Sequence, residues 1–217
     1  MLNMKGLMKS TIIFLFAAAA LGSIAQTTAA DAPPAGHYTL DKAHSTITFR
    51  VSHMGFSFYT ASFAKFDASL DFDPAKLETA KLEATIDAAS LAIPAPPEGF
   101  LEILLGPVWL NTDRFPTITY RSTQVRSIGT NTATVAGNLT LNGKTAPVTL
   151  EVTFNGGYAG KAGFDPNARV GFSAQGSFKR SDFGVLTGIP PAGSMMGVGD
   201  QVSFVIETEF HGPALSP

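Results

Sequence analysis

Apolar and polar side chains alternate along most of this chain, which is the pattern of β-strands with one buried face. Between residues 44 and 53, for example, Ile47, Phe49 and Val51 share one face and polar residues separate them. The pattern predicts strands at 44–53, 57–72, 79–88, 117–127, 132–141, 145–154, 169–180 and 201–211. Short strands at this spacing, separated by turn residues, favour an all-β sandwich or barrel.

Two local signals refine this prediction. Asn142-Gly143 separates two alternating runs, and both residues tolerate the positive φ that a tight type I′ hairpin turn needs. Within 57–72 the apolar residues occupy odd positions up to Phe63 and even positions from Phe66 onwards. We expect one extra residue, a β-bulge near Ala64-Lys65, to reconcile the two halves and to curve the sheet.

Two predicted strands end their apolar rows with an ionisable group. His53 continues the face of Val51, and Arg180 continues the face of Phe178. Such groups are unusual in a fully packed core. We therefore expect an apolar cavity with a polar spot, which suits an amphiphile. A buried Arg180 would need Asp182, a turn carbonyl or a ligand head group as its partner.

The first 30 residues have the pattern of a secretory signal peptide. Lys5 and Lys9 precede an apolar run at 12–21, and small residues follow it. The run is too short for a membrane-spanning helix, which needs roughly 20 apolar residues. We expect cleavage after Ala30 or Ala25, leaving 31–217 as one domain. In a bacterium the destination would be the periplasm.

Composition and charge narrow the classes of function. Removing Lys5 and Lys9 changes the formal charge from −2 to −4, and there is no basic run. The electrostatic pattern of a nucleic-acid-binding protein is therefore absent. The chain has no cysteine, which excludes disulfides and cysteine nucleophiles. An outer-membrane barrel would need an apolar outer face, but Lys81 and Glu83 alternate with Leu82 and Ala84, which predicts a soluble barrel with its apolar face inside.

Two inserts interrupt the strand pattern. Residues 98–110 are nearly all apolar and predict one or two helical turns, interrupted at Gly106-Pro107. This insert is either a plug at one barrel end, anchored by Trp109, or a mobile lid over a cavity. The second insert, 188–197, carries Met195-Met196, which either line a portal or belong to an ordinary loop.

Patterns for catalysis and metal binding are weak. Asp41, His44 and Ser45 suggest a hydrolase of a lipid-like ester or phosphate, but neighbouring strand residues point to opposite faces. The chain also lacks the Gly-x-Ser-x-Gly elbow. His44 and His53 lie in opposite strand phases, so they do not predict a metal site. We expect no catalysis, no cofactor and no metal.

Four blocks of sequence resemble one known family. They lie at 40–57, 115–120, 137–148 and 180–184, the last followed by Gly199-Asp200. In this order they resemble the YceI-like family of exported polyisoprenoid-binding proteins over essentially the whole chain after residue 30. The resemblance implies a lipocalin-like, eight-stranded antiparallel barrel holding a long-chain amphiphile in an apolar tunnel. The stretch from Glu98 to Trp109 departs from the family, since it lacks histidine, and Ala61-Ser62-Phe63 lacks the family's usual Gly.

Together these observations predict a secreted barrel, monomeric or weakly dimeric, that carries an isoprenoid, an isoprenoid quinone or a fatty-acid-like ligand. We expect neither nucleic-acid binding nor stable membrane insertion. A stress-protective interaction module with a solidly packed core is a further alternative. The candidate ligand-binding residues are Phe49, Val51, His53, Phe66, Trp109, Tyr120, Phe172, Phe178, Arg180, Asp182 and Phe204.

Overall fold

The computed structural model describes residues 32–215, so the expected signal peptide lies outside the described residues. The fold is all-β with one short α-helix, α1 (Phe100–Leu105). The strands are β1 (Gly36–Leu40), β2 (Thr46–His53), β3 (Ser57–Phe63), β4 (Phe66–Phe72), β5 (Lys81–Asp87), β6 (Leu91–Ala92), β7 (Thr117–Ser127), β8 (Thr132–Leu141), β9 (Lys144–Tyr158), β10 (Asn167–Lys179) and β11 (Val198–Ala214). Single-turn 3₁₀ helices lie at η1 (Lys42–His44), η2 (Leu77–Thr79), η3 (Ala88–Ser90) and η4 (Arg180–Phe183).

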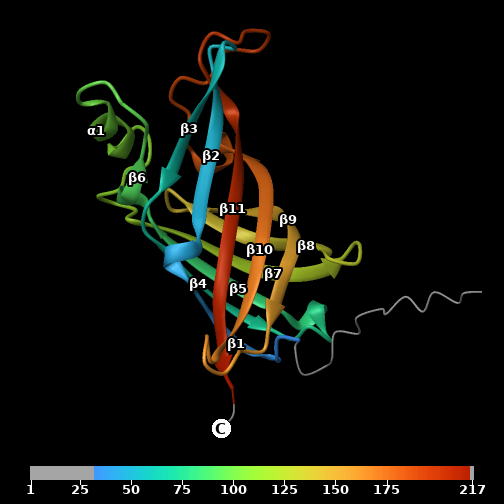
Figure 1. Ribbon diagram of the computed structural model, residues 1–217. Helices are drawn as coiled ribbons and strands as arrows, with labels where there is room; N and C mark the ends of the chain where they lie inside the picture. The colour runs from blue at the N-terminus through green and yellow to red at the C-terminus, as the bar shows by residue number, and fades with distance from the viewer. Residues whose placement is uncertain (1–31, 216–217) are drawn as a thin grey trace, which may run out of the picture.

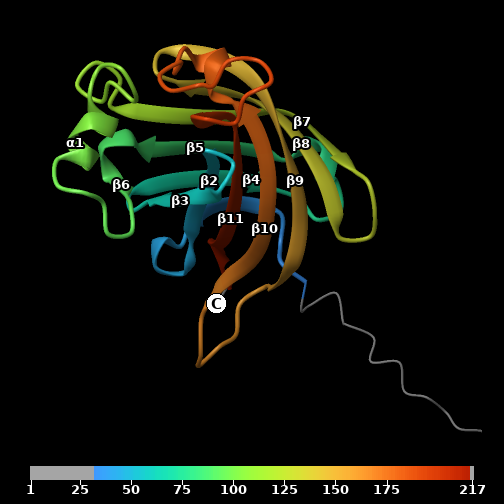
Figure 2. The ribbon, with the colours of Figure 1, turned by 90° about the horizontal axis from the view of Figure 1, so that it is seen from above.

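The strands close into an eight-stranded antiparallel barrel, as the sequence predicts (Figures 1 and 2). β11 pairs with β10 on one side and with both β1 and β2 on the other. β1 and β2 share one strand position of the barrel. β4 pairs with β1 and β3 pairs with β2, so β4 and β3 share the next position. β5 pairs with β4 and β6 pairs with β3, so β5 and β6 share the position after that. Three of the eight strand positions are therefore each made of two short strands. The other five are the continuous strands β7 to β11, and the pairing of β5 with β7 closes the barrel.

The phase change expected near Ala64-Lys65 is the point at which one wall breaks. The Ala64 amide donates to the Ser90 carbonyl, and the Asp87 amide donates to the Lys65 carbonyl, both at 3.0 Å. The chain thus leaves β3 and enters β4 with its apolar side chains still inside, and η3 breaks the neighbouring wall at the same height. A break between two strands replaces the expected bulge.

Strand boundaries differ from the prediction mainly near the N-terminus. β1 was not predicted, since only Tyr38 and Leu40 carry its buried face. η1 delays the start of β2 to Thr46, because Asp41 caps it by accepting the Ala43 amide at 3.1 Å. β9 and β11 are longer than expected, and they span the barrel from end to end (Figure 1).

The β8–β9 hairpin confirms the turn prediction. Asn142 and Gly143 have φ of 51° and 71°, the two positive values of a type I′ turn. A Cβ on Gly143 would lie 2.3 Å from the Phe115 ring, so this position needs glycine for space as well. Pro147 lies opposite Asn138 of β8. On its other side β9 pairs with β10 only from Glu151 onwards, so no strand there requires the amide hydrogen that proline lacks.

One end of the barrel is filled with aromatic rings, and we call it the closed end. It is formed by β1, β4, the start of β10 and the end of β11. Phe72 packs against Tyr38, Phe154 and Phe172 at centroid distances of 5.8–6.1 Å. The Tyr38 hydroxyl donates to the Pro34 carbonyl at 2.6 Å, which satisfies the polar atom of a fully buried side chain.

α1 lies beside β6 at the side of the barrel (Figure 2). It ends at Leu105, so the predicted interruption at Gly106-Pro107 is confirmed. None of the helices within residues 32–215 combines the length and apolarity needed to span a bilayer.

Candidate ligand cavity

A cavity of about 680 Å³ lies inside the barrel. It runs from the aromatic floor of the closed end to the opposite end, where the β2–β3 turn, the loop 185–199 and the insert 99–112 meet. We call that opposite end the mouth. The lining includes every predicted ligand-binding residue except Asp182, namely Phe49, Val51, His53, Phe66, Trp109, Tyr120, Phe172, Phe178, Arg180 and Phe204.

The inward side chains leave the interior hollow. Phe49, Phe66, Phe172, Phe178 and Phe204 point into the barrel, yet each is only half-buried. The area that they leave uncovered faces the cavity, because their strands enclose it. A packed-core module would need an unbroken interior, which this barrel does not have.

Exposed residues line the cavity in two places. At the mouth the exposed lining residue is His53, next to the half-buried Tyr59. At the side, near the β7–β8 turn, the exposed lining residues are Pro74 and Thr130 to Thr132. The two places differ in chemistry, because aromatic and apolar side chains surround His53, whereas the second combines threonine and asparagine side chains with Pro74.

Arg180 is the charged group in the cavity wall nearest the mouth. Its side chain is 4% exposed and donates to three carbonyls, from Nε to Gly199 (2.9 Å), from Nη1 to Val185 (2.9 Å) and from Nη2 to Val198 (2.8 Å). Its guanidinium carbon lies 5.2 Å from the centre of the Trp109 ring. Loss of hydration on burial lowers the pKa of Arg180, and no carboxylate among residues 32–215 lies within 4.0 Å of it.

Of the three partners that the sequence allows for Arg180, Asp182 is not the one observed. Asp182 is exposed and lies outside the cavity, since η4 turns the chain away from the β10 face after Lys179. The carboxylate that orders this turn is Asp200, which accepts the Ser181 amide at 2.9 Å and the Ser181 hydroxyl at 2.8 Å. Arg180 therefore has turn carbonyls as its partners, one of the alternatives that the sequence left open.

Tyr120 contributes its ring to the lining, but its hydroxyl is occupied. The hydroxyl donates to the Val135 carbonyl at 2.9 Å and lies 3.3 Å from that of Val148. Burial raises the pKa of Tyr120, so it remains a neutral donor. Its role in the cavity is therefore apolar.

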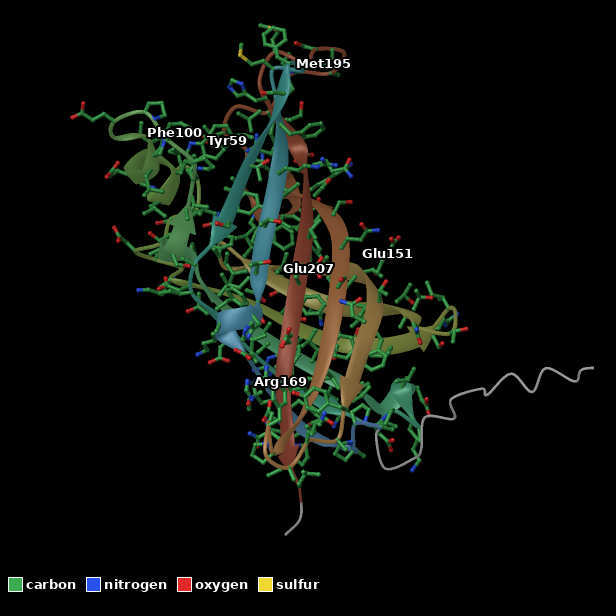
Figure 3. All side chains as sticks on the ribbon, in the orientation of Figure 1. Tyr59, Phe100, Glu151, Arg169, Met195 and Glu207 are labelled. Atoms are coloured by element: carbon green, nitrogen blue, oxygen red, sulfur yellow. The ribbon has the colours of Figure 1, made fainter. Side chains whose placement is uncertain are left out.

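The insert 99–112 forms part of the cavity wall. Phe100, Leu104, Trp109 and Leu110 line the cavity, and the ring of Phe100 meets that of Tyr59 edge to face at 6.1 Å (Figure 3). The chain after α1 folds back on the helix, where the Leu110 amide donates to the Leu104 carbonyl at 3.0 Å. The insert thus covers the barrel beside β6, and its opening as a lid stays a prediction.

The residues of the hydrolase alternative lie outside the cavity. Ser45 is buried, but it does not line the cavity. Its hydroxyl donates to the Asp41 carbonyl (2.7 Å) and accepts a hydrogen bond from the Glu209 amide (3.2 Å). The His44 ring contacts the Asp41 carboxylate at 2.8 Å and makes no hydrogen bond to Ser45. The three side chains do not form a relay from acid to base to nucleophile.

Asp41 is instead the centre of an ionic network at the closed end. Its Oδ2 lies 2.8 Å from Arg169 Nη1 and 2.9 Å from His211 Nε2. Arg169 also binds Asp165 and, at 3.1 Å, Glu209. Asp41, His44 and Glu209 are close enough to hold a metal ion, but the Arg169 guanidinium already lies between the two carboxylates. The group is thus best explained as an ion-pair network.

Several lining residues were not among the sequence-based candidates. Phe154 helps to form the cavity floor, Tyr59 and Phe100 lie at the mouth, and Val185 and Val198 flank Arg180. Tyr59 shares the alternating face of its strand, which is a usable signal. Val185 and Val198 lie in or next to the loop after η4, where no periodicity marks an inward side chain.

The closed antiparallel barrel and its apolar cavity define a lipocalin-like barrel protein. The sequence matches the YceI-like domain family over residues 38–210, and this chain belongs to that family. A UPF0312 protein of Azotobacter vinelandii is 34% identical over 190 residues, which are 86% of this chain and 92% of the relative.

Solved structures show the same barrel. The crystal structure of BcnA from Burkholderia cenocepacia matches with a TM-score of 0.65 and 27% identity, covering 78% of this chain and 98% of BcnA. A polyisoprenoid binding domain from Saccharophagus degradans matches with a TM-score of 0.57 over 82% of this chain and 99% of that domain. At 12% identity, the second likeness concerns the fold alone.

Proposed function

We propose that this protein is an exported carrier that holds one long-chain amphiphile in its barrel and does not transform it. The observation that carries the proposal is the set of inward phenylalanines left half-buried around a cavity of about 680 Å³. Pockets that bind small molecules measure roughly 300–1,000 Å³ and combine apolar walls with a few polar groups. An isoprenoid chain, a fatty chain or an isoprenoid quinone suits this lining.

The tail supplies affinity, and Arg180 supplies orientation. Burying about twenty methylenes is worth roughly 16 kcal/mol before the costs of ordering the chain and of association are subtracted. A guanidinium has five N–H groups, and only three of those on Arg180 have acceptors among residues 32–215. An electron-rich head group, such as a carboxylate, a phosphate or a quinone carbonyl, therefore belongs beside Arg180 and Trp109.

The proposal of export rests on the signal-peptide pattern of residues 1–30, and the bacterial source of the relatives supports the periplasm as the destination. The absence of catalysis rests on geometry, since the Ser45 hydroxyl is held by backbone groups away from both His44 and the cavity. The carrier acts as a monomer or a weak dimer and needs no cofactor.

Filling the cavity should abolish ligand uptake. Ala174 faces the cavity on β10, so Ala174→Phe places a ring in the space that the tail would take. Gln175→Phe is the matched control, because Gln175 neighbours Ala174 on β10 but is exposed on the outer face. We expect Ala174→Phe to weaken binding of a fluorescent fatty-acid or polyprenyl probe at least roughly tenfold, while Gln175→Phe leaves it unchanged.

The measurement has an internal reporter, because Trp109 is the sole tryptophan of the chain and lines the cavity. Probe uptake should change its emission, and solvent extraction with mass spectrometry of protein from its native compartment should recover a lipid. Repeated recovery of no lipid, together with no Trp109 response to either probe, would refute the carrier.

A further inference from the structure

Large exposed apolar side chains gather at the mouth of the barrel. Seven of the eleven such residues in the described chain lie on the three segments that meet there: Phe56, Phe58, Ile103, Val108, Leu186, Met195 and Met196. Phe56 and Met195 are 81% and 71% exposed. Met195 lies at the tip of the molecule in Figure 3. Of the remaining four, Phe164 and Leu215 lie at the β9–β10 loop, and Ile128 and Val205 lie elsewhere, which is ordinary for a protein surface.

The three segments touch one another in a closed ring, which we call the mouth ring (51–59, 185–199 and 99–112). The Met54 amide donates to the Gly197 carbonyl at 2.7 Å, which joins the β2–β3 turn to the loop 185–199. The Thr187 hydroxyl donates to the Val108 carbonyl at 2.8 Å, which joins that loop to the insert. The contact of Phe100 with Tyr59 joins the insert back to β3.

The mouth ring is also nearly free of charge. Residues 51–59 and 185–199 contain no Asp, Glu, Lys or Arg, and the insert 99–112 contains only Glu102. Elsewhere the chain carries 16 acidic and 15 basic residues. Two stretches far apart in the sequence are thus depleted of charge at the one place where they meet around the cavity.

We propose that the mouth ring docks on the surface of a lipid bilayer, so that the carried amphiphile moves between bilayer and cavity without crossing water. This proposal rests on the carrier function and names the partner of the same site. The chemistry fits, because Phe56 and the two methionines enter the apolar layer without bringing charge, while the Arg50 guanidinium, 4.8 Å from the centre of the Phe58 ring, stays at the polar edge of the mouth ring. Tyr59 and Trp109 lie just behind them, and both residue types favour the membrane interface.

A second copy of the chain fits this end less well. A stable protein interface buries roughly 800 Å² on each partner with complementary packing. The mouth end instead tapers to the β2–β3 turn and the loop 185–199 (Figure 1). A bilayer accepts projecting side chains of any shape, and an uncharged tip on an acidic protein needs no anionic lipid.

Vesicle flotation of the purified protein tests the proposal. The variant is Phe56→Ser with Met195→Ser, and the matched control is Phe164→Ser. Phe164 is 80% exposed, as Phe56 is, but it lies in the β9–β10 loop at the closed end. With vesicles of phosphatidylcholine alone, the double variant should lose at least roughly tenfold in partition coefficient, since one buried Phe side chain is worth a factor of that order. Phe164→Ser should float as the wild type does.

Other outcomes overturn the proposal. Binding that requires phosphatidylglycerol and disappears in high salt would show electrostatic adsorption in place of apolar docking. An equal loss in Phe164→Ser would show that any exposed ring suffices. A wild type that fails to float and elutes as a dimer, which the double variant separates, would assign the ring to a second copy.

Ligand uptake from vesicle-free solution separates this proposal from the carrier function. The double variant should still bind a soluble fatty-acid probe with wild-type affinity, read from Trp109 emission, because Phe56 and Met195 do not line the cavity. Flotation without any probe uptake by the wild type would refute the carrier and leave the docking in place.

Discussion

The barrel has an arginine near each end, the half-buried Arg169 and the buried Arg180, and the two are held in different ways. At the closed end Arg169 contacts Asp41, Asp165 and Glu209, and these contacts raise its pKa. At the mouth Arg180 contacts only uncharged acceptors, and burial lowers its pKa. One end neutralises its cation within the fold, and the other leaves positive charge beside a cavity.

The packing of the two ends follows the same division. Aromatic rings close the barrel above the Arg169 network, whereas Phe178 and Phe204, near Arg180, keep area facing the cavity. Protein interiors are otherwise close-packed, and voids cost stability. The closed end therefore supplies stability, whereas the mouth keeps a cation without a contacting carboxylate beside empty volume, as the proposed ligand site requires.

The largest effect on stability should come from breaking the network at the closed end. Arg169→Met leaves Asp41 and Asp165, both largely buried, without their cation. We expect the free energy of unfolding to fall by about 3 kcal/mol, and Tm by about 6–12 °C for a domain of this size. Ligand uptake should not change, because Arg169 does not line the cavity.

Arg121→Met is the control for that experiment. Arg121 lies 3.8 Å from Glu83 with both side chains mostly exposed, so its loss should cost under about 1 kcal/mol. Urea unfolding of both variants measures the difference. Equal and small effects of the two substitutions would show that the network does not distinguish the closed end.

The sequence predicted the barrel because alternation marks a one-sided strand. It placed β7 and β8 at their observed bounds and put Ile47, Phe49 and Val51 on the cavity face. It missed β1, since two inward residues are too few to establish a period. The change of phase at Ala64-Lys65 was located from the sequence. That the chain ends one strand and begins another there depends on hydrogen bonds with Ser90 and Asp87, which no local pattern encodes.

The polar part of the site was only partly predictable. Arg180 follows the β10 face and lines the cavity, whereas Asp182 was one of the three partners that the sequence allowed for it. In the 3₁₀ turn η4, with three residues per turn, side chains two apart no longer share a face. The carbonyl partners of Arg180 belong to residues up to 19 positions away, and every residue has a carbonyl, so nothing in the sequence marks them.

Acid should lower the stability of the fold through the carboxylates of the closed end. Burial alone would raise the pKa of Asp41, but hydrogen bonds from His44, His211 and Arg169 outweigh burial and hold that pKa far below its usual range. The hydrogen bond from Arg169 lowers the pKa of Asp165 to about 2. Unfolded aspartates titrate near 3.9, so below about pH 4 the unfolded chain binds more protons than the folded protein does. Stability therefore decreases as the pH is lowered through this range.

Asp41→Asn isolates this contribution. The Asp41 carboxyl adds up to about 1.4 kcal/mol per pH unit to the slope of stability against pH between its folded and unfolded pKa values. The variant should be less stable than the wild type at neutral pH and should show a shallower fall between about pH 4 and pH 2. Urea midpoints across this range provide the measurement, and parallel curves for the two proteins would contradict the assignment.

The smallest effect on stability should come from the exposed rings, and it should be equal at the two ends. Phe56→Ser and Phe164→Ser each remove a side chain that is about 80% exposed, so each should change the free energy of unfolding by less than about 0.5 kcal/mol. Thermal unfolding without lipid checks this. Since folding does not require Phe56, a difference between the two variants that appears only with vesicles belongs to the mouth ring. A stability loss of several kcal/mol in Phe56→Ser alone would instead make the ring part of the fold.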